Sequence, residues 1–288
     1  MGCVLYDDRL RLPPRSAVDD CRGEAGHRCG ADEWRPNGRE AMSERIDDAL
    51  DAVAAERATI SAERDALSAF DRRVEELEAV TVSGGPSLLA DQRQSDRSLE
   101  RVRTAYAETL MAVPHYESEY DDTLAESLAA EFGDDLAAAL LSGEALTPTI
   151  RNAVRAAAAA AQNEREEFLD VLDREAASLE AAAADIDEVR AELRALDDGP
   201  LSAQRFDELR RRWQGVRDLE ARVDGIGRRR QETIRSHRSD LPGVPTDLSE
   251  YLYADLSSPY PVLATLATVG ERLTGARRRV ERELAATA

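Results

Sequence analysis

The residues that could carry chemistry are few, and they lie in separate parts of the chain. Histidine and cysteine each occur three times, and lysine is absent, so all 38 basic residues are arginine. Without lysine, the chain lacks the phosphate-binding lysine of P-loop nucleotide hydrolases and any nucleophile for Schiff-base chemistry. The composition therefore excludes both of these enzyme classes.

The first candidate metal site is formed by Cys21, His27 and Cys29. Their spacing matches no zinc pairing of the Cys-x2–4-Cys kind, and a fourth ligand would have to be the distant Cys3. We therefore do not expect these residues to bind a metal.

The second candidate metal site is His115 with Glu119, four residues further on. Three more acids lie beside them: Glu117, Asp121 and Asp122. Two ligands on one helix face are a weak metal signal, and acids in the first turn of a helix also stabilise its dipole. We predict no metal site and no cofactor.

His237 has hydroxyl and carboxyl groups beside it in sequence. These neighbours are Ser236, Ser239 and Asp240. Side chains that are adjacent in sequence at a helix end do not converge into a catalytic triad. We predict no catalytic residues and a protein that is not an enzyme.

Arginines cluster at residues 210–212, 228–230 and 277–279. Such clusters can contact nucleic-acid phosphates, but they can equally pair with acidic helices of the same molecule, and high salt weakens phosphate contacts. We predict intramolecular pairing. A nucleic-acid-associated regulator that uses the arginine-rich arm 205–238 is the alternative function.

Tyrosines gather near the C-terminal part of the chain, at Tyr251, Tyr253 and Tyr260, with Pro259 and Pro261 beside them. A buried tyrosine needs little more than a hydrogen-bond partner for its hydroxyl. We predict a packed corner, and a binding pocket is the alternative.

The charge balance indicates the setting of the protein. Acids outnumber bases 58 to 38, for a net charge of -20. A GC-rich genome explains arginine in place of lysine but not the excess of acids, whereas a cytosol at high salt explains both, since salt screens self-repulsion. No stretch has the ~20 apolar residues of a membrane helix, and no secretory signal is visible. We expect a halophilic, cytoplasmic protein with no membrane partner.

Heptad periodicity predicts the helices that must position these residues. Residues 43–80 form one amphipathic helix, with Ser43 as its cap, and two of its seam positions carry Glu56 and Glu63 instead of apolar side chains. Short helices follow over 96–146, where apolar residues recur every four positions and Gly133 is expected to break the segment.

Two long arms, 148–197 and 203–239, are predicted to form an antiparallel coiled-coil hairpin. Thr147 and Pro148 start the first arm, and Glu175 is the one polar residue of its seam. Residues 164–198 carry 13 acids and 4 arginines, and residues 203–240 carry 7 acids and 11 arginines, so opposite charges favour pairing. A tight turn at Gly199 and Pro200 pairs residues whose numbers add to about 399.

The rest of the chain completes an all-α fold, an elongated hairpin plus a small helical bundle. Residues 241–260 form a loop and a short helix, and residues 260–285 form the C-terminal helix. Residues 42–288 are expected to be a single helical domain. Residues 1–41 show no apolar periodicity and are expected to be a disordered or misannotated extension, with translation starting at Met42.

Several short segments resemble an uncharacterised haloarchaeal family of all-helical proteins, a domain of unknown function. They are Met-Ala-Val-Pro-His-Tyr at 111–116, Leu-Thr-Pro at 146–148, Tyr-Leu-Tyr-Ala-Asp-Leu at 251–256 and Tyr-Pro-Val-Leu at 260–263. The resemblance spans about Met42 to the C-terminus and implies an archaeal, intracellular setting, but no activity. Together with the fold, this favours a protein–protein interaction or scaffold protein, with self-association left open and no nucleic-acid partner expected.

Overall fold

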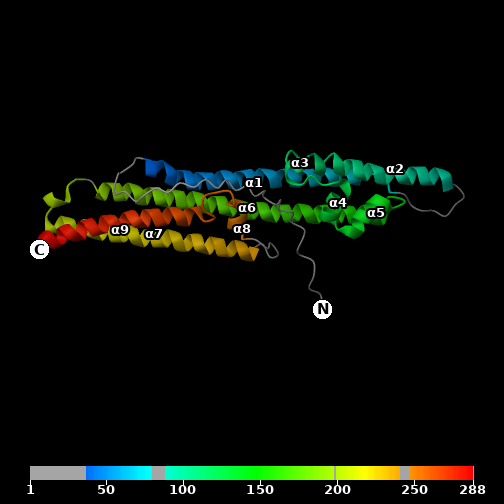
Figure 1. Ribbon diagram of the computed structural model, residues 1–288. Coiled ribbons are helices and arrows are strands. Elements are labelled where there is room, and N and C mark those ends of the chain that lie inside the picture. The colour runs from blue at the N-terminus through cyan, green and yellow to red at the C-terminus, as the bar shows by residue number, and fades with distance from the viewer. Residues whose placement is uncertain (1–36, 80–87, 198, 241–246, 288) are drawn as a thin grey trace. The chain divides into compact units, whose positions relative to one another are not determined.

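The computed structural model describes residues 37–79, 88–197, 199–240 and 247–287, and every regular element in these ranges is a helix (Figure 1). The long helices are α1 (Asn37–Glu75), α6 (Pro148–Leu196), α7 (Phe206–Asp240) and α9 (Pro261–Thr287). The shorter ones are α2 (Leu88–Ala107), α3 (Tyr116–Glu119), α4 (Leu124–Phe132), α5 (Asp134–Ser142) and α8 (Leu248–Leu252), with 3-10 turns η1 (Leu110–Ala112) and η2 (Leu201–Ala203). The fold is all-α, as the periodicity predicts.

No helix in the described ranges combines the length and the apolar character that a membrane span requires. Contacts between residues divide the chain into two compact units. Among the described residues, the first unit consists of 56–79 and 88–171, and the second consists of 37–55, 172–240 without 198, and 247–287. Helices α1 and α6 contribute residues to both units.

The first unit is built around aromatic side chains from α1, α2 and α4. The Phe70 ring stacks on Phe132 at 5.7 Å between centroids and meets Tyr106 edge-on at 5.5 Å. Aliphatic side chains surround these rings, among them Leu99, Leu128, Leu140 and Leu146. The short helices 116–142 therefore close over the apolar faces of α1 and α2 and place their polar residues at the edge of this core.

The breaks between the short helices follow from local sequence. Gly133 adopts a φ of 84°, which favours glycine, and separates α4 from α5 as predicted. A second break precedes α4, where Asp121 has a φ of 47° and Thr123 forms a capping box with Glu126. The sequence prediction missed this second break, because it treated Tyr116 and Tyr120 as part of the helix that follows.

The start of α6 agrees with the sequence prediction. Pro148 is its first residue, and the Thr147 hydroxyl accepts a hydrogen bond from the Ile150 backbone N–H at 3.2 Å. The predicted cap of the first helix is wrong: α1 begins at Asn37, so Ser43 lies inside the helix. The expectations for Cys3, Cys21, His27 and Cys29 fall outside the described residues.

In the second unit, α9 packs along α7 (Figure 1). The Trp213 indole N–H donates to Glu281 at 3.1 Å, and Arg277 Nε donates to Glu220 at 3.0 Å. Buried aliphatic residues lie on the inner faces of both helices, and they include Leu209, Val216, Leu219, Ile226, Val262, Val269 and Leu273. These contacts fix α7 between α9 on one flank and the ion pairs that it makes with α6 on the other.

The pairs between α6 and α7 run in antiparallel order but not in the predicted register. Arg222 forms ion pairs with Glu188 and Glu192, and Arg229 forms one with Asp185. The predicted register places Glu188 opposite residue 211 and Asp185 opposite residue 214, so the observed partners lie 11 and 15 positions further along α7. The prediction assumed a tight turn at Pro200, whereas α6 ends at Leu196, α7 begins at Phe206 and η2 lies between them. The coiled-coil packing of the two arms stays a prediction.

Candidate functional site

Glu63 is the centre of a buried ionic network in the first unit. Its side chain is 10% exposed and comes from α1, at a position that the heptad pattern assigns to the apolar seam. The carboxylate accepts hydrogen bonds from Arg165 Nε at 3.2 Å, His115 Nε2 at 3.2 Å and the Tyr120 hydroxyl at 2.8 Å. Arg165 of α6 also binds Glu131 of α4 through both terminal nitrogens at 2.8 Å. One guanidinium therefore bridges two carboxylates.

The surroundings of Glu63 keep it ionised. Burial alone would raise its pKa, but the hydrogen bond from His115 and the charge of Arg165 outweigh burial and hold the pKa below its usual value. Burial and the charge of Glu63 raise the pKa of Tyr120 far above its usual value, so its hydroxyl stays protonated. The hydrogen bond to Glu63 raises the pKa of His115. A protonated His115 brings the formal charge of the two carboxylates and the guanidinium to zero.

A small pocket, with about 30 Å³ that a molecule the size of water can reach, lies beside this network. Its walls are formed by Leu67, Tyr106, Leu110, Val113, Tyr116 and Ser127, together with Glu63, Tyr120, Glu131 and Arg165. Binding pockets usually present a few polar groups on apolar walls, and this one has that character. Its charged groups already bind one another, however, so a ligand that used them would first have to break an ion pair.

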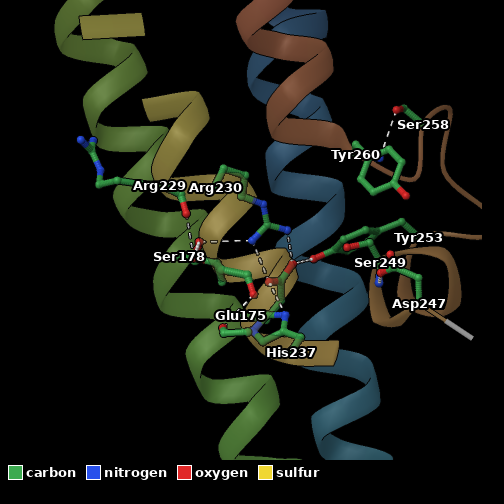
Figure 2. A network of polar contacts seen from close by, with 12 residues as sticks. Glu175, Ser178, Arg229, Arg230, His237, Asp247, Ser249, Tyr253, Ser258 and Tyr260 are labelled. Carbon is green, nitrogen blue, oxygen red and sulfur yellow. Dashed lines mark hydrogen bonds and ion pairs between the residues drawn. The ribbon is translucent and has the colours of Figure 1, made fainter. Parts of the chain in front are cut away.

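Glu175 is the centre of a second network, in the second unit (Figure 2). Arg230 of α7 binds it through both terminal nitrogens, with Nη1 at 2.7 Å from Oε2. The Tyr253 hydroxyl, at the end of α8, donates to Oε1, and His237 Nδ1 lies 3.6 Å from Oε2. Arg230 Nη1 also donates to Ser178 at 3.2 Å. The side chains of Glu175 and Arg230 are 1% and 2% exposed, so this ion pair is shielded from water.

Both ends of this ion pair stay charged. Burial would raise the pKa of Glu175, but the hydrogen bonds and charge of Arg230 lower it below its usual value. Burial would lower the pKa of Arg230, and Glu175 raises it instead. Burial and the charge of Glu175 raise the pKa of Tyr253. A buried carboxylate with several donors is well suited to hold three helices together and poorly suited to accept a proton from a substrate.

The structure places the candidate metal ligands near His115 in different surroundings. His115 Nε2 faces Glu63 of α1, while Glu117 and Asp121 are exposed to solvent. Among the described residues, no group of three or more histidine, cysteine, aspartate and glutamate side chains is arranged to hold a metal ion. The hydrogen-bond partner of His115 is therefore 52 positions away in sequence, although Glu119 is still near enough for its charge to raise the His115 pKa.

His237 contacts Glu175 of another helix and not the serines beside it in sequence. Its ring is buried against Glu175, whereas Ser236 is exposed and its hydroxyl donates to the Thr233 carbonyl at 2.9 Å. The side chains of Ser239 and Asp240 lie outside the described residues. The histidine belongs to the Glu175 network.

Several of the clustered arginines pair within their own unit, as predicted. Arg229 and Arg230 bind Asp185 and Glu175 of α6. In α9, Arg277 binds Glu220 and Glu281, and Arg279 binds Asp197. The neighbouring Arg228 is exposed.

The three clustered tyrosines differ in burial. Tyr251 and Tyr253 are buried, which agrees with the predicted packed corner, and Tyr253 donates to Glu175. Tyr260 is half-buried, and its backbone N–H donates to the Ser258 hydroxyl at 3.2 Å (Figure 2).

Sequence reasoning missed the centres of both networks as sites, although the signal was present. Glu63 and Glu175 are polar residues at seam positions, and a buried carboxylate requires a cationic partner. Their partners Arg165 and Arg230 lie 102 and 55 residues away in sequence, so no local pattern identifies them.

A family model described as "Domain of unknown function (DUF7260)" matches residues 44–277 of the chain. No curated protein and no solved structure matches the chain.

Proposed function

We propose that this chain, which belongs to the DUF7260 family, is a non-enzymatic helical scaffold that works by binding other proteins. One observation carries the proposal: the side chains best able to do chemistry bind one another between helices. His115, Tyr120 and Arg165 converge on Glu63, and a similar set converges on Glu175.

The protonation states support this view. A general acid or base works best with a pKa near the operating pH. The pKa values of Glu63 and Glu175 are lowered, and those of Tyr120 and Tyr253 are raised, so all four move away from neutrality. Groups in these states hold structure together, and the exposed surface is left for recognition.

The alternative is a nucleic-acid-associated regulator that uses arm 205–238. Arg222, Arg229 and Arg230 of this arm are engaged by carboxylates of α6, which removes them from phosphate binding. The net charge of -20 also repels a polyanion at long range. Both observations favour a protein partner.

The proposed setting is the cytoplasm of a haloarchaeon. The excess of acids, which salt would screen, supports it, and so does the family resemblance. In this setting, close-range packing and short ion pairs have to carry recognition, because long-range charge effects are screened.

The test is affinity capture of the tagged chain from its native cells at native salt after mild cross-linking, with and without nuclease. We expect protein partners in near-stoichiometric amounts that resist nuclease treatment. Capture of no protein above the tag control would contradict the proposal. Capture of nucleic acid, with proteins that are lost after nuclease treatment, would favour the regulator instead.

A further inference from the structure

The outward face of α7 carries a row of arginines, called here the arginine stripe. It consists of Arg210, Arg217, Arg228 and Arg235, and all four are exposed. At 100° per residue, they fall within about 20° of one another around the helix. The buried residues of the same helix, such as Leu219 and Ile226, lie on the opposite side. The stripe therefore points away from the core of its unit.

The stripe differs from the other arginines of α7 in its partners. Arg222, Arg229 and Arg230, on the flank that faces α6, each have a carboxylate within hydrogen-bonding distance. Among the described residues, the nearest carboxylate to any stripe arginine is Glu220, at 3.8 Å from Arg217. Three stripe arginines, Arg210, Arg228 and Arg235, therefore form no ion pair within the described part of the chain and are available to a partner.

The first unit contains a strongly acidic segment. Residues 115–147 contain nine acids and no arginine. Five of these acids are exposed and have no ion pair within the described part of the chain. They are Glu117, Asp121, Asp134, Asp135 and Glu144, and this set of exposed acids is called here the acidic face. The same sequence therefore presents a basic row on one unit and an acidic face on the other.

We propose that the arginine stripe of one copy binds the acidic face of a second copy of this chain. The inference rests on the proposed scaffold function and names its partner. The contact joins two different surfaces: if it forms once between two copies it generates a ring or a filament, and if it forms reciprocally it closes a two-fold pair. A nucleic acid is the competing partner for a row of arginines, and the test distinguishes the two.

The test uses charge reversal and sedimentation velocity on the full chain over a KCl series. The stripe variant combines Arg228→Glu with Arg235→Glu, and the face variant combines Asp135→Arg with Glu144→Arg. The control combines Arg278→Glu with Arg282→Glu, two exposed arginines of α9, so its net charge changes as much as that of the stripe variant. Circular dichroism establishes that each variant is folded.

Over the KCl concentrations at which circular dichroism shows the native chain folded, we expect concentration-dependent association that weakens as KCl rises. Each exposed ion pair contributes little, so removing two of them by charge reversal should weaken association about two- to thirtyfold. The control should associate like the native chain. A mixture of the stripe and face variants should regain association, because their reversed charges complement each other.

Three results would overturn the inference. The native chain could be monomeric at every concentration and salt, the control could lose association as much as the stripe variant, or the mixture could fail to recover. Binding of an RNA or DNA oligonucleotide that only the stripe variant loses would assign the stripe to nucleic acid. A monomeric chain that still captures protein partners from cells would refute this inference and leave the scaffold proposal standing.

Discussion

Replacing Arg230 with methionine should destabilise the second unit strongly. The side chains of Arg230 and Glu175 are 2% and 1% exposed, so the change leaves a carboxylate that water cannot reach. Removal of one partner from a buried ion pair typically costs about 3–5 kcal/mol. Tyr253 and His237 keep their contacts with Glu175, which places the expected cost toward the lower end of this range.

Arg229→Met is the matched control, because the two arginines are neighbours on the same helix. The Arg229 side chain is 63% exposed, and its partner Asp185 is 39% exposed. Exposed ion pairs contribute about 0.2–1 kcal/mol, so this variant should lose no more than that. The two variants differ in the burial of the pair and not in the chemistry of the substitution.

The assay is denaturant unfolding at fixed KCl, followed by the fluorescence of Trp213 in a chain whose other tryptophan, Trp34, is replaced by phenylalanine. This tryptophan lies on α7 and donates to Glu281 of α9, so its signal reports on the second unit. A second variant, Glu175→Leu with Arg230→Met, should recover most of the stability, since an apolar pair often replaces a buried ion pair at little cost. Equal losses in the two single variants would refute the argument from burial.

Three further predictions concern the protonation of His115, the burial of Ile186 and the net charge of the chain. The hydrogen bond to Glu63 raises the pKa of His115, so the contribution of His115 to stability is complete below about pH 6.5 and is lost as the pH rises through the raised pKa. The free energies of unfolding of the native chain and of His115→Gln should therefore differ more at pH 6 than at pH 9. A difference that stays constant with pH would contradict this prediction. Ile186→Asp places a charge at a buried position and should reduce stability by several kcal/mol. Glu188→Gln, on the exposed side of the same helix, should reduce it by at most about 1 kcal/mol. Thermal melts measure both changes, and similar melting curves would mean that Ile186 is not buried. Because the net charge is -20, helicity measured by circular dichroism should increase from dilute buffer to molar KCl, and full helicity at 50 mM would rule out the halophilic interpretation.

Much of the fold could be predicted from sequence because its signals are local. Thr147 and Pro148 start a helix through their own backbone chemistry, and Gly133 ends one because it accepts a positive φ. The seven-residue periodicity likewise depends only on which side of each helix is apolar. The register of α6 against α7 is different, since it depends on the path of residues 197–205, and no periodic pattern specifies that path.

Only one member of each buried ion pair, the carboxylate, could be identified from the sequence. The polar seam residues Glu63 and Glu175 can be read directly from the heptads, and burial requires each to have a cationic partner. Which arginine fills that role depends on how distant helices pack: Arg165 approaches Glu63 from α6, and Arg230 approaches Glu175 from α7. Sequence proximity pointed to Glu119 as the partner of His115, while the structure places Glu63 there.

The central claim is that the buried networks hold the helices together while the exposed surface binds proteins. The most direct test compares the partners captured from native cells by the native chain and by the Glu175→Leu, Arg230→Met variant, once circular dichroism shows that the variant is folded. The account predicts the same proteins in the same amounts, because the substitutions leave the surface unchanged. Loss of those partners by a folded variant would contradict it and would assign the Glu175 network a role beyond stability.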